Sequence, residues 1–128
     1  MSAQNNKNSF KKILLAEDDD SMRRFVEIIL QKAGYEVLTA EDGLAAMQIA
    51  LSTNINAIVA DAIMPHLSGF DLCRMLRGNA ETKEIPLIML SGLAQQNSEE
   101  SGGCLADAFL TKDANLKNQL VSALKKLL

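Results

Sequence analysis

The stretch KKILLAEDDDSMRRFVEIILQKAG, residues 11–34, decides the fold of this chain. It opens with a short run that ends in four apolar residues, a pattern typical of a buried strand. From residue 21 onward, apolar residues recur with helical spacing until Gly34 ends the pattern. The expected inner face of this helix comprises Met22, Phe25, Val26, Ile29 and Leu30. A strand therefore passes directly into a helix, and four acidic residues occupy the junction.

The same alternation of strand and helix continues to the end of the chain. Apolar runs predict further strands at residues 35–40, 56–60, 85–90 and 106–111. Helical spacing predicts helices at 44–51, 69–77 and 114–128, the first of them capped by Asp42. Strands that alternate with helices are joined by right-handed crossovers and form a parallel sheet with helices on both faces. The expected fold class is therefore α/β.

Composition limits the chain to one domain. It has 128 residues, of which 48% are hydrophobic, and this is enough for a single core. We expect residues 1–9 to form a flexible polar tail and residues 10–128 to form the domain. The net charge of −3 offers no basic surface for nucleic acid. No apolar run approaches the roughly 20 residues of a membrane span, so no membrane contact is expected.

The expected location is the cytoplasm. The N-terminal residues lack the apolar stretch of a signal peptide. Cys73 and Cys104 do not have the spacing of metal ligands, and we expect both to be buried thiols in a reducing compartment.

Four of the predicted strands end at polar residues of the kinds used in phosphoryl chemistry. Glu17 and Asp18 follow the first strand, Asp61 the third, Ser91 the fourth and Lys112 the fifth. The carboxyl ends of parallel strands open into one crevice, so these side chains are expected to converge there. Three carboxylates, a hydroxyl and an ammonium group would then share a site for a metal ion and an anion.

Taken in this order, these residues resemble the receiver domain of bacterial two-component response regulators, the CheY-like family. The features that carry the resemblance are Glu17-Asp18, Asp61 followed by Met64-Pro65 and Gly69, Ser91-Gly92, Phe109 and Lys112. The resemblance covers residues 10–128 and implies a flavodoxin-like (βα)5 three-layer sandwich, with a parallel five-stranded sheet of order 2-1-3-4-5. It also implies a signalling protein that modifies its own aspartate, not an enzyme that turns over a separate substrate.

The resemblance implies that Asp61 accepts a phosphoryl group from a histidine kinase or a phosphotransfer protein. Repulsion between its carboxylate and the anionic phosphoryl group calls for a divalent cation, which is Mg²⁺ in this family, with Mn²⁺ as a substitute. The expected metal ligands are the side chains of Glu17, Asp18 and Asp61 and the backbone carbonyl of Ile63. We expect a stand-alone receiver that acts through a downstream effector protein, and a phosphorylation-dependent dimer is also compatible with the family.

Three further residues complete the implied mechanism. Lys112 is expected to neutralise Asp61 and then to bind a phosphoryl oxygen, while the Ser91 hydroxyl donates a hydrogen bond from the far side. Phe109 is expected to swing inward when Ser91 moves toward the phosphoryl group. A buried phenylalanine with no switching role remains the alternative at that position.

The sequence departs from the family pattern in three places. Asp113 stands where the family has a proline after the lysine; a cis bond before a non-proline residue costs about 3 to 4 kcal/mol, so we expect a trans peptide after Lys112. Asp113 is expected to cap the last helix instead. Leu105 replaces a glycine before the fifth strand, which predicts a rebuilt turn. Ile63 and Leu93 are apolar and cannot orient a hydrolytic water, which predicts a long-lived phosphoryl group.

Other functions remain open. A pseudo-receiver would bind protein partners without being phosphorylated, because the lysine loop is altered. A Mg²⁺-dependent phosphatase of the haloacid-dehalogenase type would carry glycine where this chain has Ser21. An EF-hand is excluded, since a loop starting at Asp18 has Arg23 and Ile29 where Gly and Glu are required. Considered alone, the acidic run at residues 17–20 is also explained as a solvated helix cap.

Overall fold

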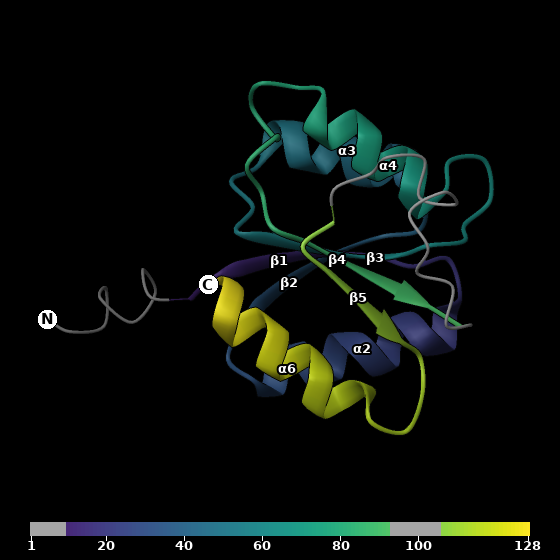
Figure 1. Ribbon diagram of the computed structural model, residues 1–128, viewed down its shortest axis with the longest axis vertical. Helices are drawn as coiled ribbons and strands as arrows, with labels where there is room; N and C mark the ends of the chain where they lie inside the picture. The colour runs from purple at the N-terminus through teal and green to yellow at the C-terminus, as the bar shows by residue number, and fades with distance from the viewer. Residues whose placement is uncertain (1–9, 93–105) are drawn as a thin grey trace, which may run out of the picture.

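The computed structural model describes residues 10–92 and 106–128, which form a parallel sheet with helices on both faces (Figure 1). Its five strands are β1 (Lys12–Ala16), β2 (Glu36–Ala40), β3 (Ala57–Asp61), β4 (Leu87–Ser91) and β5 (Ala108–Thr111). Their order is β2-β1-β3-β4-β5, and every neighbouring pair is parallel. The predicted α/β class, the flavodoxin-like layering and the strand order are therefore confirmed.

Two of the described helices cover each face of the sheet. α3 (Gly43–Ser52) and α4 (Gly69–Arg77) lie on one face, and α2 (Asp20–Lys32) and α6 (Leu116–Leu127) lie on the other (Figure 1). The tail expected at residues 1–9 and the turn expected around Leu105 lie outside the described residues. None of the described helices is long and apolar enough to cross a membrane.

The hydrophobic core is divided into two layers by the sheet, because successive side chains of a strand point to opposite faces. In β1, Leu14 and Ala16 pack with α3 and α4, whereas Ile13 and Leu15 pack with α2 and α6. Every residue of β3 and of β4 is buried. These central strands are thus enclosed on both sides, and their carboxyl ends hold the polar residues that follow in fixed positions.

The sequence predicts two helix caps, and the structure shows one of them. Asp42 caps α3 as predicted, and its carboxylate accepts a hydrogen bond from the backbone N–H of Ala45 at 2.8 Å. The prediction that Asp113 caps the last helix is wrong, because α6 begins later, after Asn115. Asp113 instead accepts a hydrogen bond from the N–H of Asn115 at 2.9 Å, which closes a local turn. The peptide after Lys112 is trans as predicted, since none of the described peptide bonds is cis.

Two side chains differ from the sequence-based expectation. Phe25 is 51% exposed, because α2 buries a stripe made by Val26, Ile29 and Leu30, and Phe25 lies at its border. Cys73 is buried as expected but is disulfide-bonded, so the prediction of a free thiol is wrong. Cys104, the only other cysteine, lies outside the described residues.

Candidate functional site

The register of the sheet brings three carboxylates together at the carboxyl ends of β1 and β3. Ala16 of β1 lies opposite Ala60 of β3, so the residues that follow, Glu17 and Asp61, are neighbours. Oxygen atoms of Glu17, Asp18 and Asp61 all lie within 4.8 Å of one another. Glu17 and Asp61 are buried, whereas Asp18 is exposed. We call these three residues the acidic cluster.

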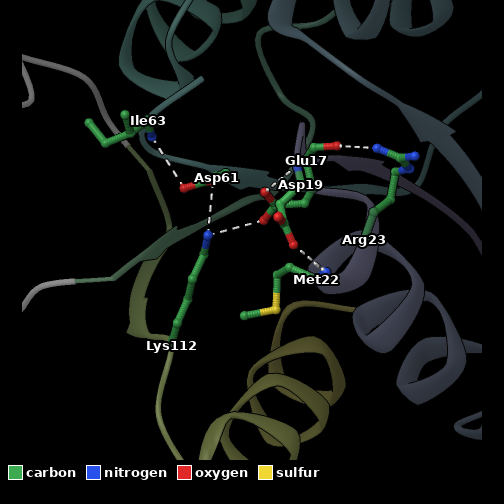
Figure 2. A network of polar contacts seen from close by, with 7 residues as sticks. All are labelled: Glu17, Asp19, Met22, Arg23, Asp61, Ile63 and Lys112. Atoms are coloured by element: carbon green, nitrogen blue, oxygen red, sulfur yellow. Dashed lines mark hydrogen bonds and ion pairs between the residues drawn. The ribbon is translucent and has the colours of Figure 1, made fainter. Parts of the chain in front are cut away.

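Lys112 reaches the acidic cluster from the residue that follows β5 (Figure 2). Its Nζ atom donates a hydrogen bond to Oδ2 of Asp61 at 2.8 Å and lies 3.1 Å from Oε1 of Glu17. Within the described residues, Lys112 is the partner in every ion pair of these carboxylates. Burial by itself lowers the pKa of Lys112, but the contacts with Asp61 and Glu17 outweigh burial and raise it. One stable positive charge therefore faces three carboxylates, and the cluster carries an excess of negative charge.

Glu17 is the most deeply buried carboxylate of the cluster, with 1% of its surface exposed. Its Oε2 accepts a hydrogen bond from the backbone N–H of Asp19 at 3.1 Å. Its Oε1 lies within ion-pair distance of Lys112 but has no hydrogen-bond partner among the described residues. Burial raises the pKa of Glu17 to about 7; the N–H of Asp19 opposes this rise, the nearby Asp61 adds to it, and Lys112 opposes it. Glu17 and Asp61 share the ammonium group of Lys112, which lies closer to Asp61. The negative charge of an ionised Glu17 is therefore only partly compensated.

The acidic cluster fits a hard divalent cation. Mg²⁺ prefers oxygen ligands and retains several waters, and the cluster offers carboxylate oxygens from three residues within 4.8 Å. A buried oxygen without a hydrogen bond, such as Oε1 of Glu17, calls for a partner that a cation would supply. The exposure of Asp18 leaves one side of the site open to water. Donor type, spacing and a buried Glu17 oxygen that only shares Lys112 with Asp61 therefore all agree with magnesium.

The other predicted site residues lie around the same end of the sheet. The backbone N–H of Ile63 donates to Oδ1 of Asp61 at 3.2 Å, while its side chain is 71% exposed. Ser91 ends β4 and is buried, and its carbonyl accepts a hydrogen bond from the N–H of Lys112 at 2.8 Å. Phe109 lies in β5 and is partly buried against the core layer on the side of α3 and α4. The structure thus brings Ile63 and Lys112 into contact with Asp61 and places Ser91 at the same edge of the sheet.

Gly69, the first residue of α4, packs directly against the backbone of Asp61. A Cβ atom at this position would lie 2.2 Å from the carbonyl oxygen of Asp61 and 2.8 Å from the sulfur of Met89. The N–H of Gly69 also donates to the carbonyl of Ala62 at 3.0 Å. The sequence marks this glycine only as part of a motif, and the close approach supplies its physical reason.

Sequence patterns assign no role to Arg23, yet its side chain contacts the backbone of the acidic cluster (Figure 2). Its Nη1 donates to the carbonyl oxygen of Glu17 at 2.9 Å, and its Nη2 donates to Oδ1 of Asp20 at 2.5 Å. The sequence places Arg23 near the start of the helix that follows the acidic run, and no other signal marks it.

Comparisons with known proteins agree with this geometry. A family model described as the response regulator receiver domain matches residues 13–125. Protein PilG from Pseudomonas aeruginosa is 34% identical over 115 residues, which cover 89% of this chain and 84% of PilG. The DNA-binding dual master transcriptional regulator RpaA from Synechocystis sp. is 34% identical over 110 residues, which cover 85% of this chain but 46% of RpaA. This chain therefore spans less than half the length of some relatives.

Among solved structures, response regulator protein TrrA from Thermotoga maritima, in complex with Mg²⁺ and BeF, is similar in fold. The two chains are 31% identical with a TM-score of 0.83, over 93% of this chain and 100% of the TrrA chain. The similarity therefore covers nearly the whole of both chains.

Proposed function

This chain belongs to the response regulator receiver domains of two-component systems, and on that premise we propose that Asp61 accepts a phosphoryl group from a histidine kinase or a phosphotransfer protein. The reaction depends on Mg²⁺, and the phosphorylated chain signals through a partner protein. The observation that carries the proposal is the convergence of Glu17, Asp18 and Asp61 within 4.8 Å, beside Lys112. Similarity to TrrA, which was solved with Mg²⁺, supports the choice of ion.

In the proposed reaction, a carboxylate oxygen of Asp61 attacks the phosphorus of the donor, and a new bond forms an acyl phosphate. The bond between phosphorus and the donor breaks, and the leaving imidazole or carboxylate retains the electron pair. Magnesium held by Glu17, Asp18, Asp61 and the backbone carbonyl of Ile63 would neutralise the repulsion between the two anions. The N–H of Ile63, 3.2 Å from Oδ1 of Asp61, restrains rotation of the nucleophile. Mn²⁺ would substitute for Mg²⁺.

Lys112 and Ser91 stabilise the product in this proposal. Lys112 neutralises Asp61 before the reaction, as its 2.8 Å contact supports, and binds a phosphoryl oxygen afterwards. The hydroxyl of Ser91 moves toward the phosphoryl group and donates a hydrogen bond to it. Phe109 then turns inward and changes the surface that a partner recognises. Because phenylalanine has no hydroxyl group, either position leaves no polar atom unsatisfied.

Intact-mass measurement after treatment with acetyl phosphate tests this function. With MgCl₂ present, the wild type is expected to gain about 80 Da, the mass of one phosphoryl group on a carboxylate nucleophile. Excess EDTA or the variant Asp61→Asn is expected to abolish the gain. A wild type that stays unmodified under all conditions would instead support a pseudo-receiver, which binds partners without phosphorylation. Sustained hydrolysis of phosphate esters would support a phosphatase.

We also propose that the phosphoryl group is long-lived. Ile63 is 71% exposed and lies beside Asp61, so an apolar side chain occupies a position from which a polar group could orient water. Leu93, the second apolar residue of this hypothesis, lies outside the described residues. Loss of phosphate within minutes, in Mg²⁺ and without a phosphatase, would contradict the hypothesis.

The domain layout and the biological setting stay predictions from the sequence. We propose that residues 10–128 form the receiver unit and that residues 1–9 precede it as a tail. A cytoplasmic location and dimerisation on phosphorylation belong to the same proposal. Size-exclusion chromatography of the chain with and without beryllofluoride and Mg²⁺ tests dimerisation.

A further inference from the structure

We propose that Arg23 is a positioning residue for the metal site, acting through the backbone of Glu17; this rests on the function proposed above. The guanidinium of Arg23 donates from Nη1 to the carbonyl oxygen of Glu17 at 2.9 Å (Figure 2). That carbonyl belongs to the peptide unit that joins Glu17 to Asp18, and both residues are proposed ligands. A peptide unit is planar and contains the Cα atoms of both residues, so a hydrogen bond to its oxygen helps to position the Cα atoms of Glu17 and Asp18.

The backbone of Glu17 is held from two sides. Its N–H donates to the carbonyl of Ala40 in β2 at 3.0 Å, which continues the strand pairing by one residue. Its carbonyl, one residue beyond the end of β1, is held by the side chain of Arg23. The sheet therefore positions the amino side of Glu17, and α2 positions the side that leads to Asp18.

Arg23 is more strongly restrained than Arg24, its neighbour on the same helix. The side chain of Arg23 is 17% exposed, and its second nitrogen is bound by Asp20 at 2.5 Å. Arg24 is 68% exposed, and its contact with Glu27 is 3.4 Å long on the outer side of α2. A guanidinium offers two donors in one plane, so Arg23 can bind the carbonyl and Asp20 together. Arg24 provides a control of the same residue type without the contact to the cluster.

The charge of Arg23 and its hydrogen-bond geometry change the affinity of the site for Mg²⁺ in opposite directions. A positive charge near the site repels a cation, so charge alone makes Mg²⁺ binding weaker in the wild type. The bond to Glu17 pre-orients two ligands, so geometry alone makes Mg²⁺ binding stronger. Arg23→Lys keeps the charge and loses the planar pair of donors, while Arg23→Gln loses both. The two substitutions therefore separate the effects.

Calorimetric titration of the full chain with MgCl₂, together with thermal melts in EDTA, tests the inference. Positioning predicts that Arg23→Lys binds Mg²⁺ about 10-fold more weakly than the wild type, the loss typical for outer partners of metal ligands. Arg23→Gln is expected to bind more weakly than the wild type as well, but by a smaller factor, because it also removes the repelling charge. Arg24→Gln is expected to bind as the wild type does. Should Arg23→Gln fail to fold, Arg23→Lys carries the test.

Three results would overturn the inference. Unchanged affinity in Arg23→Lys with tighter binding in Arg23→Gln would assign the effect to charge. Lower melting temperatures in EDTA with unchanged Mg²⁺ affinity would assign Arg23 a structural role only. Absence of Mg²⁺ binding by the wild type would overturn the proposed function and this inference with it, whereas the first two results leave the proposed function intact.

Discussion

The substitution Gly69→Ala tests whether the start of α4 holds the backbone of Asp61 in its reactive position. The added Cβ would lie 2.2 Å from the carbonyl oxygen of Asp61 and 2.9 Å from the Cα of Ala62. Non-bonded heavy atoms prefer about 3.5 Å, so strand end and helix must separate by roughly 1.3 Å. Overpacking of this kind costs about 1–3 kcal/mol of stability. Neither backbone atom can rotate away, so the displacement is shared between the start of α4 and the backbone of Asp61.

We expect this displacement to slow phosphorylation of Asp61 even under conditions in which the variant remains fully folded. A misplacement near 1 Å costs on the order of a hundredfold in rate, because the nucleophile no longer points at the reacting atom. The rate is measured as the growth of the phosphorylated species by intact mass, with acetyl phosphate and MgCl₂. Urea unfolding followed by circular dichroism gives the stability, and the rate is measured where Gly69→Ala is fully folded.

Gly92→Ala is the matched control for stability. Among the residues that the structure describes, a Cβ at Gly92 would meet nothing within 4 Å, although this residue follows Ser91 at the same end of the sheet. It is expected to unfold at the same urea concentration as the wild type. Wild-type stability together with a wild-type rate in Gly69→Ala would refute the argument that this contact positions Asp61.

Three other predictions concern single side chains. Burial raises the pKa of Glu17 from 4.5 to about 7, so this carboxyl group stabilises the folded state when it is neutral. Its contribution to the free energy of unfolding is full below pH 4.5 and is lost as the pH rises through 7. In EDTA the wild type should therefore lose on the order of 3 kcal/mol of unfolding free energy across this range, and Glu17→Gln should flatten the slope in urea unfolding; equal slopes would contradict this. Ile63→Asn, which adds a polar group beside Asp61, should shorten the phosphoryl half-life followed by intact mass; an unchanged half-life would count against a water-orienting role. Asp19→Ala removes the cap whose Oδ2 accepts from the N–H of Met22 at 2.7 Å, and should cost about 1 kcal/mol in urea unfolding, whereas Ser21→Ala should cost less.

The fold and the membership of the acidic cluster followed from local patterns in the sequence. Apolar runs and helical spacing are set by neighbouring residues, so the alternation of strands and helices could be predicted without knowledge of contacts. Polar residues at the ends of β1 and β3 then had to meet, because parallel strands bring their carboxyl ends to one edge. The approach of Glu17, Asp18 and Asp61 is therefore a consequence of topology.

Features that depend on close approach in three dimensions could not be predicted in this way. The contact of Gly69 with Asp61 and the bond from Arg23 to the carbonyl of Glu17 join different elements, and no periodic pattern records them. Asp113 has the residue type of a helix cap, but the backbone after it turns first, and its carboxylate serves that turn. His66 adopts a φ of 69°, a left-handed conformation that apolar runs and helical spacing do not record.

The most direct test of the account is the stoichiometry and affinity of Mg²⁺ binding, measured by calorimetric titration of the wild type and two variants. We expect one ion per wild-type chain and at least about 10-fold weaker binding in both Asp18→Asn and Asp61→Asn, since the two residues lie at the ends of different strands but share one ion. Glu81→Gln, an exposed acidic residue outside the cluster, should bind as the wild type does. Unchanged binding in either cluster variant would contradict the account.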